Sequence, residues 1–249
     1  DLDGDGLSDL FMTHLQEETH TLYSARKAGA FRDGTGKAGL NLSTRPMTGF
    51  GLAALDVELD GDIDLAIANG RVRIGPVYDG CTLEGAWARL AERNSLLLGG
   101  GGSFVDEQRA ALAFTGPILV DRCVIQGDID ADGDVDLIVT GCATGARVLE
   151  NTAERAGRWV QVDPRTREDA ATALCTRVTV RAGDLALTRT SRASDGYQTS
   201  RDPRPHFGVP MATRAVDVEV AWPDGTQETF RGLEVERVHR VLRGAGESL

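Results

Sequence analysis

The chain contains Asp128-Ile-Asp130-Ala-Asp132-Gly133-Asp-Val-Asp136-Leu137, an acidic stretch from which much of its architecture can be predicted. Two further stretches align with it without gaps: Asp1-Leu-Asp3-Gly-Asp5-Gly6-Leu-Ser-Asp9-Leu10 and Asp56-Val-Glu58-Leu-Asp60-Gly61-Asp-Ile-Asp64-Leu65. All three follow the pattern D-x-[DE]-x-D-G-x-x-D-L, and the last Asp recurs after 55 and then 72 residues. We call them loop 1 (residues 1–10), loop 2 (56–65) and loop 3 (128–137). Because recurrence at such intervals is the signature of a repeat architecture, the chain is predicted to consist of repeated units.

Short apolar or β-branched segments flank the loops and predict β-strands. Residues 50–55 and 118–125 lead into loops 2 and 3, and residues 65–68 and 137–140 follow them. The wider second interval predicts an insertion, which we place at Arg71–Arg93. Short strands at regular spacing are typical of propellers, sandwiches and barrels. The expected fold is therefore all-β: a partial β-propeller with one blade for each of the three loops, followed by a β-rich C-terminal domain.

The loops have the donor pattern of a calcium site. Asp at positions 1, 3 and 5 places carboxylates on one side of a turn, Gly at position 6 permits a sharp reversal, and position 9 adds another carboxylate. Ca²⁺ takes roughly six to eight oxygen ligands, which such a set can supply. The predicted ligands are Asp1, Asp3, Asp5 and Asp9; Asp56, Glu58, Asp60 and Asp64; and Asp128, Asp130, Asp132 and Asp136. Up to three structural Ca²⁺ ions are expected, and the longer Glu58 is expected to alter the second site.

An EF-hand is excluded as the alternative metal motif. That motif needs a bidentate Glu at position 12 and flanking helices, whereas position 12 is Met12, Ile67 and Val139 here, and each loop leads into a strand-like segment. Solvated acidic turns without metal are the other alternative. The loops hold 14 of the 38 acidic residues, whose charges repel at short range unless a cation is present, so three loops in register favour metal.

Composition narrows the classes of function. The 249 residues carry a formal net charge of −11, which argues against nucleic acid as a partner because phosphate binding needs clustered Lys and Arg. No apolar run is long enough for a membrane-spanning helix. Cys81, Cys123, Cys142 and Cys175 form no CxxC pair, so free thiols and disulfides both stay open. Because the chain starts inside loop 1, we expect it to be truncated at its N-terminus.

Residues 1–156 resemble the FG-GAP/VCBS repeats of integrin-like propellers. The resemblance rests on the three loops and on the sequence from Gly51 to Gly70 around loop 2. It implies that each loop joins the first two strands of a propeller blade and binds calcium.

Residues 157–249 resemble the ASPIC/UnbV domain of the cartilage acidic protein family. The matching segments are Gly157-Arg-Trp159-Val-Gln-Val162, Arg177-Val-Thr-Val180, Gly196-Tyr197-Gln-Thr-Ser200, His206-Phe207-Gly208 and Val218-Glu-Val220-Ala-Trp222-Pro223-Asp-Gly225. Residues 166–176 depart from the Asn-Arg and Gly-Ala-rich sequence usual before the second strand of that domain. The resemblance implies that the two parts of the chain pack together.

No catalytic set is evident in the sequence. The four histidines form no metal-binding motif, His206 is expected to be packed or hydrogen-bonded, and no Gly-x-Ser-x-Gly nucleophile occurs. We therefore expect a calcium-binding module in an extracellular, periplasmic or cell-surface location. It would serve adhesion, scaffolding or interaction with a protein or glycan ligand. Two alternatives stay open: an enzyme on the same propeller (a lyase, hydrolase or secondary-metabolite tailoring enzyme), and a carbohydrate-binding module.

Overall fold

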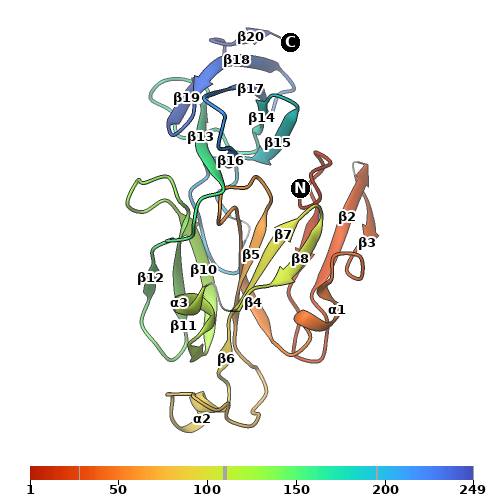
Figure 1. Ribbon diagram of the computed structural model, residues 1–249, viewed down its shortest axis with the longest axis vertical. Helices are drawn as coiled ribbons and strands as arrows, with labels where there is room; N and C mark the ends of the chain where they lie inside the picture. Colours follow the sequence, from red (N-terminus) through yellow and green to blue (C-terminus); the bar gives the residue numbers. More distant parts are fainter. Residues whose placement is uncertain (28, 109–110, 195, 249) are drawn as a thin grey trace.

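The computed structural model describes residues 1–27, 29–108, 111–194 and 196–248, and strands dominate it (Figure 1). The prediction of a mostly β fold with several antiparallel sheets is confirmed. The helices are single turns, α1 (Leu40–Ser43), α2 (Gly85–Ala88) and α3 (Leu112–Thr115). None of these described helices has the length and apolar surface that crossing a lipid bilayer requires.

Three antiparallel sheets form the blades of the N-terminal part. The first contains β1 (Leu10–Met12), β2 (Thr21–Lys27) and β3 (Ala30–Asp33). The second contains β4 (Gly49–Leu55), β5 (Asp64–Asn69), β7 (Ser95–Gly100) and β8 (Ser103–Asp106). The third contains β10 (Asp121–Gly127), β11 (Asp136–Gly141) and β12 (Arg147–Leu149). Loop 1 precedes β1, loop 2 joins β4 to β5, and loop 3 joins β10 to β11, as expected.

Strand β5 explains why the blades stack face to face. All six of its residues are buried, so both faces of the strand are covered. Because successive side chains of a strand point to opposite faces, Leu65 and Ile67 join one core cluster while Ala66 and Ala68 join another. The first cluster contains Leu22 of the first blade, and the second contains Val139 of the third blade. The middle blade is thus packed between its two neighbours.

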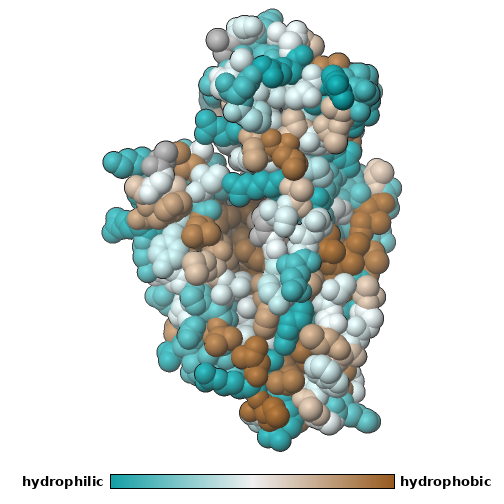
Figure 2. All heavy atoms as spheres, turned by 180° about the vertical axis from the view of Figure 1, so that it is seen from behind, coloured by the Kyte–Doolittle hydropathy of each residue, from teal (hydrophilic) through white to brown (hydrophobic). Residues whose placement is uncertain are grey.

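The insertion between β5 and β7 lies where the repeat spacing placed it. It carries α2 and the short β6 (Glu92–Arg93), which pairs with β9 (Ile118–Leu119). A buried ion pair anchors its base, with Nε of Arg71 3.4 Å from Oε1 of Glu92. Its tip exposes the apolar side chains of Val72, Ile74, Val77 and Trp87, and Figure 2 shows hydrophobic atoms gathered at this end of the molecule.

The residues from Gly157 onward form two further sheets around their own core. One sheet contains β13 (Gly157–Arg165), β16 (His206–Pro210) and β19 (Val238–Leu242), in the order β16-β13-β19. The other contains β14 (Arg177–Ala182), β15 (Leu185–Thr190), β17 (Ala215–Ala221), β18 (Gln227–Glu234) and β20 (Glu247–Ser248). Buried residues of both sheets, among them Val160, Phe207 and Val218, share one cluster. This C-terminal part lies over the end of the blades that carries the loops (Figure 1).

Candidate metal centre

The three loops share one pattern of hydrogen bonds, which holds their backbones in the same turn. The position-9 carboxylate accepts the N–H of position 2 and an N–H from a later segment, and the position-1 carboxylate accepts the N–H of the position-6 glycine. The donors are Leu2, Ala25 and Gly6 in loop 1, Val57, Gly99 and Gly61 in loop 2, and Ile129, Asn151 and Gly133 in loop 3. Each position-6 glycine has a positive φ, the conformation that glycine adopts without strain. The repeat seen in the sequence is therefore also a repeat of local structure.

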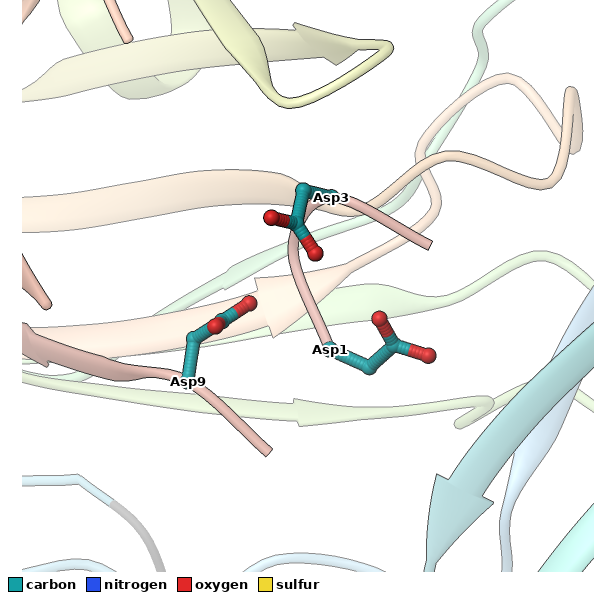
Figure 3. Close-up of side chains that lie close together, drawn as sticks. All are labelled: Asp1, Asp3 and Asp9. Atoms are coloured by element: carbon teal, nitrogen blue, oxygen red, sulfur yellow. The ribbon is translucent and has the colours of Figure 1, made fainter. Parts of the chain in front are cut away.

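Loop 1 brings three of its predicted ligands together. Asp1, Asp3 and Asp9 each offer one carboxylate oxygen, and these atoms all lie within 4.8 Å of one another. In Figure 3 the carboxylates of Asp3 and Asp9 face one another, and Asp1 stands beside them. Oδ1 of Asp1 and Oδ1 of Asp3 are buried and accept no hydrogen bond from the described residues. A buried carboxylate oxygen without a partner is costly, and a cation in this space would satisfy both atoms.

Loop 3 forms the equivalent cluster from Asp128, Asp130 and Asp136, again with one oxygen from each within 4.8 Å of the others. Oδ1 of Asp128 is buried and accepts no hydrogen bond from the described part of the chain. Burial raises the pKa of Asp128, although backbone hydrogen bonds from the loop act in the opposite direction, and the charges of Asp132 and Asp136 raise it further. Loops 1 and 3 thus both present a set of oxygen donors that fits a hard divalent cation.

The position-5 carboxylates lie outside these clusters and serve the turns instead. In each loop Oδ1 of position 5 accepts the backbone N–H of position 7, in the short turn that Asp characteristically forms with its own backbone. The acceptors are Asp5, Asp60 and Asp132, at 2.8 to 2.9 Å. Asp132 also pairs with Arg155, whose Nη2 lies 3.3 Å away. Their predicted role as metal ligands stays a prediction.

Loop 2 differs from the other two loops. Among the described residues its four predicted ligands, Asp56, Glu58, Asp60 and Asp64, form no comparable cluster. The Asp56 carboxylate is fully buried and occupied by other partners: Oδ2 accepts the N–H of Gly208 at 3.0 Å and lies 3.6 Å from Nη2 of Arg189. The same Nη2 donates to the carbonyl of Gly61 at 3.3 Å. A guanidinium from the C-terminal part therefore neutralises part of the charge of this loop.

Burial makes the ionised forms of Asp56 and Asp64 in loop 2 unfavourable. Burial, with a smaller effect of the Glu58 and Asp56 charges, raises the pKa of Asp64 to about 8. Burial also raises the pKa of Asp56 to about 6, although Arg189 acts in the opposite direction. A cation at loop 2 would have to displace protons and compete with Arg189. Loops 1 and 3 are consequently the better candidates for metal.

The C-terminal part contacts loop 3 through two aromatic residues. His206 is hydrogen-bonded, as expected, because its Nε2 lies 2.9 Å from the carbonyl oxygen of Gly133. Burial lowers the pKa of His206 to about 4, so the ring is neutral near pH 7 and its Nε2–H donates. Trp159 stacks on this ring with centroids 6.0 Å apart, and its indole lies over Gly133. Gly133 thus permits the turn of loop 3 and is also the residue on which the C-terminal part packs.

Replacement of Gly133 by Ala is expected to destabilise the protein by roughly 2–3 kcal/mol. An added Cβ would lie only 1.9 Å from Nε1 of Trp159, and the φ of +97° disfavours any side chain. Gly183→Ala is the matched control, because Gly183 also has a positive φ (+63°) but no heavy atom within 4 Å of the added Cβ. Urea unfolding should show a clearly smaller loss for Gly183→Ala, and equal losses would contradict the docking contact.

Sequence reasoning missed Arg189 and Gly208 as partners of Asp56. Gly208 belongs to the segment His206-Phe207-Gly208, which supported the resemblance to the ASPIC/UnbV domain but did not indicate a contact with Asp56. Arg189 lies within β15 and is part of no motif.

Two family matches agree with this geometry. Residues 1–67, which include loops 1 and 2, match an FG-GAP-like repeat. The N-terminal part of the chain therefore contains an FG-GAP-like repeat, the kind of repeat that forms propeller blades. Residues 166–248 match the family described as ASPIC and UnbV, so the chain combines an FG-GAP-like repeat with a C-terminal ASPIC/UnbV domain. Loop 3 lies outside both matched spans, and its hydrogen bonds place it with the other two loops. No curated protein matches the chain.

Proposed function

We propose that the chain is a calcium-binding recognition module of an extracellular or cell-surface protein. The observation that carries the proposal is the pair of converging acidic clusters, whose buried oxygens accept no hydrogen bond from the residues that the structure describes. Ca²⁺ at these clusters would be held by Asp1, Asp3 and Asp9 in loop 1 and by Asp128, Asp130 and Asp136 in loop 3. Bound there, the ion would supply positive charge and fix the loop, without a catalytic role. Loop 2 uses Arg189 as its counter-charge.

Calcium at the loops would also support the packing of the two parts of the chain. His206 and Arg189 of the C-terminal part contact the position-6 carbonyls of loops 3 and 2. We place the division between a propeller part (1–156) and an ASPIC/UnbV part (157–249) immediately before β13. A module fixed in this way presents a rigid surface to a protein or glycan ligand, which suits adhesion or scaffolding.

The extracellular location follows from the expected affinity. Extracellular calcium modules typically have Kd values of roughly 10⁻⁴–10⁻³ M. Each cluster contains three carboxylates, and of these six residues only Asp136 is buried, whereas the other five are partly buried or exposed. Sites of this kind would fill where calcium is millimolar.

Isothermal titration of the chelator-treated chain is expected to show two calcium ions per chain. Asp128→Asn removes one carboxylate charge from the loop 3 cluster, so this variant should bind one calcium ion per chain. Asp184→Asn, in the exposed turn between β14 and β15, is the matched control and should leave two. Failure of the wild-type chain to bind calcium at millimolar concentration would refute the proposal, as would unchanged binding by Asp128→Asn.

A further inference from the structure

A cavity of about 240 Å³ lies between loop 1, the second blade and the C-terminal part. Its apolar wall comes from the blades and includes Phe11, Leu52 and Leu65. The facing wall comes from the C-terminal part and is strongly basic. Four arginines line it: Arg177, Arg189, Arg192 and Arg201. Such a concentration of cations is unexpected in a chain whose net charge is −11.

Several residues that line the cavity have a buried polar atom that makes no hydrogen bond within the described residues. Among these atoms are Nε of Arg189, a donor, and Oε1 of Gln126, an acceptor. Both residues line the cavity, so a ligand with polar groups of both kinds could pair with them. Buried polar atoms are normally paired in proteins, and those at a cavity are therefore indicators of a binding site.

Three carboxylates also line the cavity, and each has its own counter-charge. Asp56 is paired with Arg189 at 3.6 Å. Asp1 and Asp9 belong to the loop 1 cluster, which calcium would neutralise. The neutralisation of Asp1 and Asp9 by calcium rests on the proposed function. When calcium is bound, the charges of Arg177 and Arg192 are not balanced by these carboxylates, so the cavity has a net positive charge. Within the described part of the chain, Nη2 of Arg192 donates to Oγ of Ser8 at 3.3 Å.

We propose that this cavity binds the oxyanion of a small organic acid, received by the guanidiniums of Arg177 and Arg192. Arginine presents a planar fork of donors that matches a carboxylate, sulfate or phosphate with two parallel hydrogen bonds. Sites for drug-sized ligands typically measure roughly 300–1,000 Å³, so a cavity of about 240 Å³ selects a smaller molecule. The apolar wall around Phe11 and Leu52 would contact the body of the acid.

Titration calorimetry of the calcium-loaded full chain tests this site with two matched pairs of probes. Glucuronate and glucose represent a sugar acid and its neutral relative, and benzoate and benzamide represent an apolar acid and its neutral relative. We expect at least one acid to bind at millimolar concentration and its neutral partner not to bind. The acid that binds shows whether the cavity receives the oxyanion of a sugar acid or of an apolar acid.

The variant Arg177→Gln/Arg192→Gln is expected to weaken acid binding at least about tenfold, because charged hydrogen bonds to the oxyanion are lost. Arg192→Lys keeps the charge but loses the fork, so its affinity should lie between those of the wild type and the Gln variant. Arg231→Gln, which removes an exposed arginine of β18 paired with Asp217 and Glu247, is the control and should bind normally.

Three results would overturn the site: equal binding of an acid and its neutral partner, unchanged binding by the Gln variant, or no acid binding by a chain that binds calcium. The last result leaves the proposed function standing. A chain that binds no calcium would refute the proposed function instead, and acid binding would then have to be measured on the calcium-free chain.

Discussion

Removal of calcium with a chelator is expected to lower the midpoint of thermal unfolding by about 10–20 °C. At about 10 mM calcium, which is about 100 times a Kd of about 10⁻⁴ M, each ion stabilises the folded state by about 2.7 kcal/mol, so two sites contribute about 5 kcal/mol. In a domain of this size each kcal/mol shifts the midpoint by roughly 2–4 °C. The physical reason is that the carboxylates at each cluster lie within 4.8 Å of one another and repel when no cation separates them.

Two comparisons make the calcium experiment specific. Magnesium at the same concentration should restore less of the midpoint, because Mg²⁺ is smaller and demands nearly ideal octahedral geometry. The variant Asp128→Asn/Asp136→Asn should lose roughly half of the calcium-dependent shift, since it retains loop 1. An unfolding midpoint that is the same with calcium and with chelator would contradict a structural role for the ion.

Replacement of Arg189 by Met is expected to destabilise the protein by about 3–5 kcal/mol, the usual cost of removing one partner of a buried ion pair. The Asp56 side chain is fully buried and that of Arg189 is 16% exposed, so little water can replace the lost charge. The carbonyl of Gly61 would lose a donor as well. Chemical denaturation monitored by tryptophan fluorescence measures the effect, and Trp159 reports on the contact between the C-terminal part and loop 3.

An ion pair formed within the C-terminal part, between Arg181 and Glu219, provides the control. Nε of Arg181 lies 2.6 Å from Oε1 of Glu219, and both side chains are substantially exposed. Arg181→Met should therefore cost no more than about 1 kcal/mol. Asp56→Asn introduced together with Arg189→Met should recover part of the loss, because the uncompensated charge is then removed. Additive effects of Arg189→Met and Asp56→Asn would contradict direct coupling of the two residues.

The sequence predicted those parts of the fold that depend on local chemistry. The three acidic loops, the strands on either side of them and the insertion after β5 all follow from residue spacing and alternation of apolar residues. The Pro223-Asp224-Gly225 turn between β17 and β18 also depends on local chemistry, because Gly225 takes the positive φ that the turn requires. The acidic loops and this turn are each recognisable from a single short segment of the chain.

The sequence predicted that the second site would differ because of Glu58, but the role of Arg189 there could not be predicted, because it depends on contacts between distant residues. Asp56 and Gly208 are 152 positions apart, and Gly61 and Arg189 are 128 apart. The loop 2 sequence differs from the others mainly at Glu58, and that difference gave no sign that a guanidinium would approach Asp56. The state of the cysteines was open for the same reason. The structure shows Cys81, Cys123, Cys142 and Cys175 as free thiols, with Cys142 and Cys175 exposed.

Anomalous diffraction from crystals grown in millimolar calcium would locate the ions directly. Two peaks are predicted, one among Asp1, Asp3 and Asp9 and one among Asp128, Asp130 and Asp136, with oxygen ligands at about 2.3–2.6 Å. The absence of density at both loops, with the six carboxylates turned outward into solvent, would contradict the account. A third peak at Asp56, with Arg189 displaced, would show that loop 2 is a metal site as well.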